Sequence, residues 1–330
     1  MPQEPRALPR HPEEVSQAQV EAALVVTVLG LMLALPAALT LVSVRHPGIL
    51  RLDSPDPTPR GYTWSLLLFL MPFAVLGIWF HRRPDLRLQR RAFLRAVPVL
   101  TAIGFSLDFF LGSVVLAFDH WDVTIGISVR VVGGYVPLEE FVFYLSGFLT
   151  ILLTYMWCDE AWLARYNDID YTAGVARVRR LVRFHSPSLI SGAVLWVAAI
   201  LYKTLVARDG GFPTYFTFLL SASIVPSVGL FHSVRPYINW RGFSLTLVLV
   251  LLVSLLWEVT LAVPYHWWSY QRRAMMGLYI GAWSSLPLEA VLVWVAVTYT
   301  TVIIYEVIKI WQASGEGAAS AFFAKDKPPI

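Results

Sequence analysis

Eight apolar runs constrain this chain more than any other feature, because each is close to the length that a helix needs to cross a membrane. A helix spans the hydrocarbon core with roughly 20 apolar residues. The sequence is 57% hydrophobic and 15% charged, which is typical of a multi-span membrane protein. We therefore predict an all-α, polytopic membrane helical bundle with about eight transmembrane helices, over residues 22–44, 62–80, 96–118, 136–157, 189–207, 212–234, 242–263 and 278–304.

Basic residues are divided unevenly between the two sides of such a bundle. Of the 26 Lys and Arg residues, 18 fall on the side that carries both termini and 8 on the other. Cytoplasmic segments of membrane proteins carry the excess of Lys and Arg. The sequence thus predicts an integral, multi-pass membrane protein with both termini in the cytoplasm. Its basic residues set topology and do not indicate a nucleic-acid partner.

Two adjacent carboxylates open the fourth run, in the sequence Pro137-Leu-Glu-Glu. Proline suits the first position of a helix, where its missing N–H costs nothing. Glu139 and Glu140 then lie in the first turn, near the positive end of the helix dipole. Asp108 and Glu258 lie within the third and seventh runs. Ionisable residues inside membrane spans are rare and suggest function.

The Pro-Leu-Glu sequence recurs at Pro287, 150 residues further on, and ends in Glu289-Ala290. A fixed offset that relates apolar and acidic positions indicates an internal duplication. We therefore predict two tandem, parallel repeats of four spans each. Ala290 stands where the first repeat has Glu140, so we expect the halves to differ chemically. The offset also pairs Thr150 with Thr300, Tyr155 with Tyr305, and Asp108 with Glu258.

The repeat divides the chain into five segments. A disordered cytoplasmic arm is predicted over 1–19, membrane units over 20–157 and 189–310, a basic cytoplasmic linker over 158–188, and a flexible cytoplasmic tail over 311–330. The linker contains Asp159, Glu160, Asp168 and Asp170, which could suggest a diphosphate–metal site. Since these acids alternate with arginine and no second aspartate-rich loop exists, we interpret them as a solvated, charged linker.

Acids and aromatic residues converge on the non-cytoplasmic half of the predicted bundle. Desolvation favours a protonated carboxyl group, whereas a helix N-terminus favours the carboxylate. Such a balance suits a group that donates or accepts a proton near neutral pH. Aromatic faces stabilise a cation in an apolar pocket, although many aromatics near span ends are interface anchors. The candidate aromatic residues are Trp121, Phe143, Trp257, Trp267 and Trp283.

Other kinds of site find little support in the sequence. The spans contain no His-x-x-x-His or Glu-x-x-His pair, so we predict no metal site. No G-x-G-x-x-G fingerprint indicates a flavin or nicotinamide cofactor, and we predict none. Cys158 is the single cysteine, which excludes an intramolecular disulfide.

Pro137-Leu-Glu-Glu at the start of a span, followed by Phe141, Phe143 and Tyr144, resembles the small integral-membrane lycopene cyclases. These are the bacterial heterodimeric cyclases, their fused archaeal forms and the cyclase half of the fungal bifunctional enzymes. Trp257-Glu, with Trp267 ten residues later, resembles the family's Trp-Asp segment. The resemblance covers most of residues 62–310 as two tandem units. The chain departs from the family at Ala290 and in having four spans per unit.

The resemblance implies a redox-neutral isomerisation without a cofactor. An acid protonates the terminal alkene of a linear carotene, a double bond further along attacks the cation, and a base removes a proton. By analogy Glu139 or Glu140 is the acid or base, with Asp108, Glu258 and Glu289 as partners or cation stabilisers. The implied partners are a lycopene-like polyene and membrane lipids, and a homo-oligomer or an association with other carotenoid enzymes stays open.

Two other classes of protein also fit the pattern. Repeats and carboxylates within the membrane mark transport pathways, so a transporter or a lipid-binding protein without cyclase activity is one alternative. A membrane prenyltransferase is the other, although the paired aspartate-rich loops of such enzymes are missing.

Overall fold

The computed structural model describes residues 12–46, 58–166, 178 and 180–323, and long helices dominate this part of the chain. An all-α architecture was predicted and is confirmed. In lipid every backbone polar group needs an internal partner, which a helix provides within one segment. The helices are α1 (Pro12–Arg45), α2 (Gly61–Ser65), α3 (Leu67–His81), α4 (Arg87–Val115), α5 (Leu138–Trp157), α7 (Ser186–Leu201), α8 (Thr214–Val234), α9 (Trp240–Trp257), α10 (Leu288–Ser314) and α11 (Ala318–Phe323).

Seven helical segments of the described chain are long and apolar enough to cross a membrane. They correspond to seven of the eight predicted spans, and the protein is accordingly a multi-pass membrane protein. The first predicted span, 22–44, lies within α1, and the apolar stretch of α1 whose residues are fully described, Ala22–Leu35, is shorter than a span. The seven segments are Gly61–His81, Arg87–Val115, Leu138–Trp162, Ser186–Ala207, Thr214–Val234, Trp240–Ala262 and Leu288–Ser314.

The last predicted span, 278–304, began too early. Tyr279 and Ile280 form a strand, and Ser284 and Ser285 adopt positive φ angles of 51° and 58°, which no helix tolerates. The helix instead begins at Leu288 and continues to Ser314. Apolar content alone could not separate the strand and turn from the helix that follows them.

The predicted terminal segments also contain helix. α1 begins at Pro12, inside the arm predicted over 1–19. In the tail predicted over 311–330, α11 follows α10, and the rings of Trp311 and Phe322 lie 5.9 Å apart. Apolar side chains of the tail therefore pack onto the bundle. Residues 1–11 and 324–330 lie outside the described residues.

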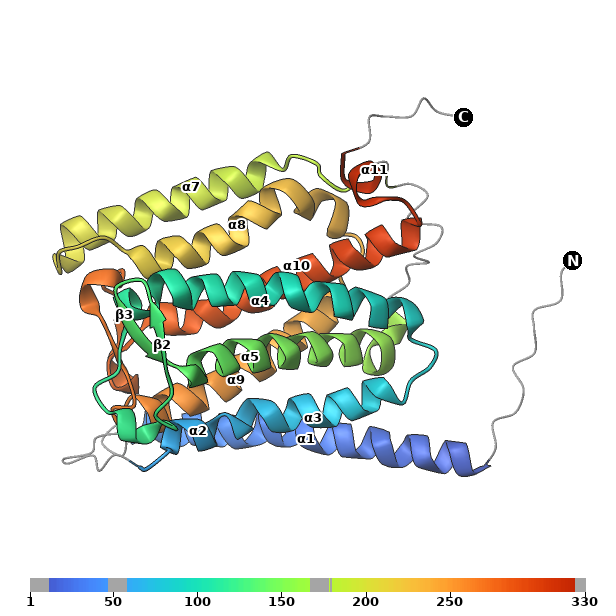
Figure 1. Ribbon diagram of the computed structural model, residues 1–330, viewed down its shortest axis with the longest axis horizontal. Helices are drawn as coiled ribbons and strands as arrows, with labels where there is room; N and C mark the ends of the chain where they lie inside the picture. The colour runs from blue at the N-terminus through green and yellow to red at the C-terminus, as the bar shows by residue number, and fades with distance from the viewer. Residues whose placement is uncertain (1–11, 47–57, 167–177, 179, 324–330) are drawn as a thin grey trace, which may run out of the picture.

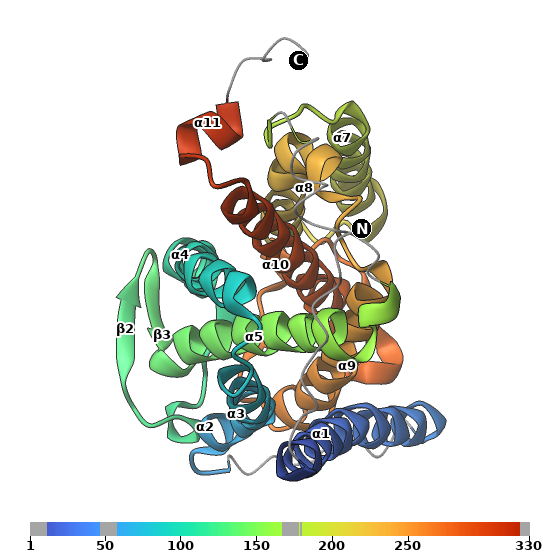
Figure 2. The ribbon, with the colours of Figure 1, turned by 90° about the vertical axis from the view of Figure 1, so that its right-hand side faces the viewer.

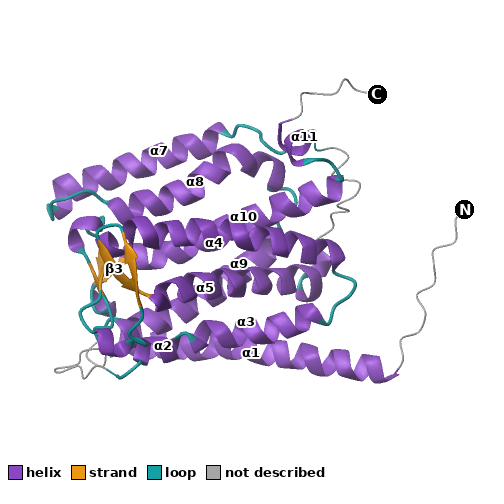
Figure 3. Cartoon of the chain, in the orientation of Figure 1, coloured by secondary structure: helices purple, strands orange, loops and turns teal. Residues whose placement is uncertain are grey.

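The helices lie side by side, and α1 begins at the same end of the bundle at which α10 finishes (Figure 1). The α3–α4 and α8–α9 junctions are at this end too. The opposite end carries the strands (Figure 3). We name these the basic end and the strand end, because Arg82, Arg83 and Arg87 lie at the first.

Arg87 and Arg130 should lie on opposite sides of the membrane, because α4 runs from the basic end to the strand end. Cysteines introduced at the two positions in a Cys158→Ser background, followed by labelling of intact cells with an impermeant thiol reagent, should modify position 130 and leave position 87 unmodified. Labelling of both positions from one side would contradict this topology, and labelling of position 87 alone would reverse the predicted orientation.

Three short two-stranded sheets close the strand end. β2 (Ser128–Val131) pairs antiparallel with β3 (Gly134–Pro137), and β5 (Tyr279–Ile280) pairs with β6 (Leu286–Pro287). β1 (Leu116–Ala117) pairs with β4 (Ser269–Tyr270), which joins the segment after α4 to the segment before α10. β3 and β6 lead directly into α5 and α10, so the hairpins fix where these helices begin.

The core of the bundle is formed by α5 and α10. Within their apolar windows, 78% and 72% of residues are buried, against 17% for α7 and α8. Figure 2 shows α5 and α10 between α3, α4, α8 and α9. α9 continues as a π-helical turn, η6 (Glu258–Ala262), whose wider winding begins at Glu258. Such turns occur frequently at functional sites.

Candidate functional site

The two adjacent carboxylates of α5 are both buried. Pro137 precedes the helix in an extended conformation and is its N-cap residue, so Glu139 and Glu140 occupy the first turn. Their exposed fractions are only 2% and 3%. Neighbouring residues of a helix point roughly 100° apart, and the two side chains accordingly have different partners.

Glu139 ties two other segments to the start of α5. Its Oε1 accepts a hydrogen bond from Thr63 Oγ1 at 2.5 Å and another from the backbone N–H of Ile125 at 2.8 Å. Thr63 belongs to α2, and Ile125 to the loop before β2. This carboxyl group therefore holds α2 and that loop against α5.

Glu140 points into a buried group of acids and phenols. Tyr62, which is fully buried, donates its hydroxyl to Glu140 Oε1 at 2.6 Å. The carboxyl group of Asp108 on α4 lies close enough to interact electrostatically with Glu140 and is also buried. Asp108 Oδ2 has no hydrogen-bond partner among the described residues. An unpaired buried acceptor of this kind can receive a proton or face a bound molecule.

The second half of the chain supplies a third acid. Glu258, where η6 begins, interacts electrostatically with Glu140 and accepts a hydrogen bond from the Tyr270 hydroxyl. Tyr270 lies outside the spans, and burial, with Glu258 as the next cause, raises the pKa of its phenol well above the usual value. Tyr270 therefore stays protonated and remains a donor. We call Asp108, Glu140 and Glu258 the carboxyl cluster.

Four tyrosines surround the carboxyl cluster. Besides Tyr62 and Tyr270, Tyr215 interacts electrostatically with all three acids, and Tyr144 interacts with Asp108 and Glu140. They come from α2, β4, α8 and α5. Both predicted units thus contribute to one buried site, rather than forming two separate ones.

Aromatic rings form a continuous wall beside the carboxyl cluster. Trp257 is at its centre, with ring centroids 4.5 Å from Phe143, 4.8 Å from Trp268, 5.4 Å from Phe69 and 5.8 Å from Tyr62. Its indole N–H donates to Ser65 Oγ at 2.7 Å. These five rings, together with Trp267 and Trp294, are the aromatic cluster. A ring wall next to acids can stabilise a developing cation.

Of the predicted substrate-binding aromatics, Phe143, Trp257 and Trp267 belong to this cluster. Trp121 is 36% exposed and contacts Phe118. Trp283 packs in a small separate cluster with Val259, Leu286 and Ala290. Trp121 lies in the 3-10 turn η2 (Trp121–Val123) and Trp283 in the 3-10 turn η8 (Gly281–Trp283), both outside the aromatic cluster.

The sequence interpretation missed several residues of the site. The offset of 150 pairs Tyr144 with Trp294, and both lie at the site. This pairing could have identified them. No comparable signal marks Tyr62, Phe69, Tyr215 or Tyr270, whereas Trp268 directly follows Trp267, a predicted aromatic residue of the site.

Glu289 is not one of the three acids of the carboxyl cluster, although Tyr215 interacts electrostatically with it too. Glu289 accepts a hydrogen bond from the Met276 backbone N–H, much as Glu139 does from Ile125. Lys203, which is buried, interacts electrostatically with Glu289 and donates to the carbonyls of Arg272, at 3.2 Å, and Met275. Glu289 thus holds a loop to the start of α10. Ala290, where the first half has Glu140, packs against apolar neighbours.

A second buried group of charges lies at the basic end, where the sequence predicted a solvated linker. Lys309 Nζ lies 3.1 Å from Asp159 Oδ2, 3.0 Å from Glu160 Oε1 and 3.8 Å from Glu306 Oε1. Asp159, Glu306 and Lys309 are at most 1% exposed. The solvated interpretation is therefore wrong for Asp159, because α10 supplies it with a counter-ion. Asp168 and Asp170 lie outside the described residues.

Among the described residues, no group of three or more His, Cys, Asp or Glu side chains could hold a metal ion.

No known family, no curated protein and no solved structure matches this chain.

Proposed function

We propose that this protein is a carotenoid cyclase, which closes the linear end group of a lycopene-like polyene into an ionone ring. The observation that carries the proposal is the carboxyl cluster, buried against the aromatic cluster within a membrane protein. Acid–base groups in an apolar, aromatic-lined site suit proton-initiated chemistry on a hydrocarbon. The Pro137-Leu-Glu-Glu motif adds the family resemblance.

Glu140 is the acid that we assign to the first step. Three neighbouring carboxyl groups in a buried site cannot all be ionised without a large electrostatic cost. The carboxyl cluster therefore contains both protonated carboxyl groups, which can donate a proton, and ionised ones, which can accept one. Tyr62 donates to Glu140 Oε1 and so orients its carboxyl group. The proton adds to the terminal alkene and leaves a tertiary cation, which the rings of Trp257 and Phe143 can face.

Ring closure and proton loss complete the reaction. An internal double bond of the polyene attacks the cation, and a new carbon–carbon bond forms. Loss of a proton from a neighbouring carbon gives the ring double bond. Asp108 and Glu258 are the bases that we propose for this step, and the atoms of substrate and product balance without an oxidant or a reductant.

Two observations support the duplication that the sequence predicted. α5 and α10 each begin at a proline that ends a hairpin strand, and the next backbone N–H bonds back to the hairpin, Leu138 to Ile127 and Leu288 to Leu278, both at 2.9 Å. Residues related by the offset also meet where α5 and α10 pack. Tyr155 and Tyr305 have centroids 6.2 Å apart, and Lys309 pairs with Asp159. Equivalent residues meet in this way at a two-fold axis.

Expression of the protein in a host that accumulates lycopene tests the proposal. Extracted pigments should contain cyclic carotenes with the mass of lycopene, because cyclisation neither adds nor removes atoms. An empty vector is the control. Protein that inserts stably and leaves lycopene unchanged would refute the cyclase assignment and favour transport or lipid binding.

A further inference from the structure

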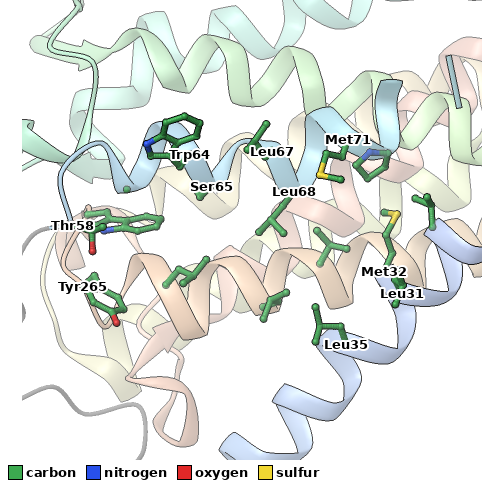
Figure 4. Close-up of a pocket in the computed structure, with 17 residues that line it drawn as sticks. Leu31, Met32, Leu35, Thr58, Trp64, Ser65, Leu67, Leu68, Met71 and Tyr265 are labelled. Carbon is green, nitrogen blue, oxygen red and sulfur yellow. The ribbon is translucent and has the colours of Figure 1, made fainter. Parts of the chain in front are cut away.

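An apolar groove of about 630 Å³ runs along the outside of the bundle between α1, α3 and α9. Figure 4 shows Leu31, Met32 and Leu35 of α1 lying toward one end and Thr58 and Tyr265 toward the other. Along α3 and the preceding α2 the lining extends from Gly61 to Pro72, which is roughly 16 Å of helix. The groove is long enough to hold an extended chain along α3.

The lining selects the chemistry of an occupant. None of its described lining residues is charged, and most are apolar. A diphosphate or a charged lipid headgroup would find no counter-ion there, and burying it unpaired would be costly. An uncharged hydrocarbon chain has no such cost. Pockets of this volume hold drug-sized ligands, so the groove fits one end of a long polyene.

The wall of the groove is shared with the aromatic cluster. Trp267 lines the groove and stacks on Tyr62 with centroids 6.5 Å apart, and Ser65 lines the groove and accepts the hydrogen bond of Trp257. A methyl group added at Gly61 would lie 2.8 Å from the Trp267 ring, so α2 and Trp267 pack in direct contact. One layer of side chains therefore separates the groove from Tyr62 and its bonded partner Glu140.

A second groove provides the comparison. It measures about 610 Å³ and lies between α7, α8 and α10. Although it is similarly large and apolar, no residue of the carboxyl or aromatic cluster lines it. The two grooves thus resemble each other in size and polarity, and they differ in that only the first is lined by a residue of the aromatic cluster, Trp267.

We infer that the groove between α1, α3 and α9 is the substrate-access site, where an uncharged linear polyene docks from the lipid and presents its end to the carboxyl cluster past Tyr62 and Trp267. The inference rests on the proposed function for its substrate. Beyond the proposed function, the inference specifies the groove in which the polyene binds and the two side chains, Tyr62 and Trp267, that the polyene passes.

The test measures retention of lycopene and does not depend on turnover. In a Glu140→Gln background, to prevent conversion, Met71→Trp should fill the groove from α3 and Leu31→Trp from α1. Both positions are more than 60% exposed, so the added rings enter the groove rather than the core. Leu195→Trp fills the comparison groove from α7, where the side chain is 50% exposed.

Each protein is purified from the lycopene-accumulating host, its monodispersity is checked by size-exclusion chromatography, and bound lycopene is measured from its absorbance relative to protein. We expect a several-fold loss of lycopene in Met71→Trp and Leu31→Trp, and no loss in Leu195→Trp. The inference would be overturned by any of three results. Both groove variants could retain as much lycopene as the parent protein, Leu195→Trp could lose as much lycopene as they do, or the parent protein could carry phospholipid instead of lycopene. If the wild-type protein forms no rings but lycopene retention still depends on the groove, the docking inference would stand and the cyclase assignment would be refuted.

Discussion

Glu140→Gln is expected to lower the rate of ring formation by about 10²–10⁴-fold, the usual cost of losing a positioned acid or base. Glutamine keeps the shape of the side chain, and its carbonyl oxygen can still accept the Tyr62 hydrogen bond. It cannot donate and recover a proton as a carboxyl group does. The measurement is the ratio of cyclic carotene to lycopene in the expression host, normalised to the amount of protein in the membrane.

Glu139→Gln and Glu289→Gln are the matched controls. Each position lies in the first turn of its helix and holds a loop through the backbone N–H of Ile125 or Met276, an interaction that a glutamine oxygen can retain. We therefore expect both controls to keep most of the activity. Ring formation that is unchanged in Glu140→Gln would exclude Glu140 as the acid and transfer that role to Asp108 or Glu258.

The contrast between Glu139 and Glu140 illustrates how far the sequence leads at this site. The motif and the repeat identified both carboxylates, and the structure buries both. The repeat retains Glu139, as Glu289, and replaces Glu140 by Ala290. Only the positions of Thr63, Ile125 and Tyr62 in space distinguish a carboxyl group that holds a loop from one that faces other acids.

Spans and acids were predictable because they depend on local pattern. Apolar length identifies a membrane helix, and an acid inside one is conspicuous in any sequence. The partners of those acids are not local. Tyr62 meets Glu140 across 78 residues of sequence, and Tyr215 reaches the same acids from α8. A tyrosine in an apolar run gives no sign of which acid it will contact, so most of the phenols could not be predicted.

The largest effect on stability is expected from Lys309→Met. This lysine is the shared counter-ion of Asp159, Glu160 and Glu306, and the variant leaves buried carboxylates without it. Removing one partner of a buried ion pair costs about 3–5 kcal/mol. Tyr155 and Gln89 still donate to Glu306 and Glu160, but neither neutralises a charge. Thermal unfolding of the purified protein in detergent should show a much lower midpoint, with helix content retained below it.

Asp85→Asn provides the matched control, because it removes a charge from an exposed pair at the same end of the bundle. Arg83 and Asp85 lie 2.8 Å apart, but their side chains are 34% and 56% exposed. An exposed pair contributes about 0–1 kcal/mol, so the midpoint should barely change. The double variant Lys309→Met with Asp159→Asn should recover part of the lost stability, because it removes one of the negative charges that Lys309 faces. Equal unfolding midpoints for Lys309→Met and Asp85→Asn would show that the buried charges do not hold α5 and α10 together. Recovery of the midpoint in the double variant would assign the lost stability to the charge of Asp159 and not to lost packing of the lysine side chain.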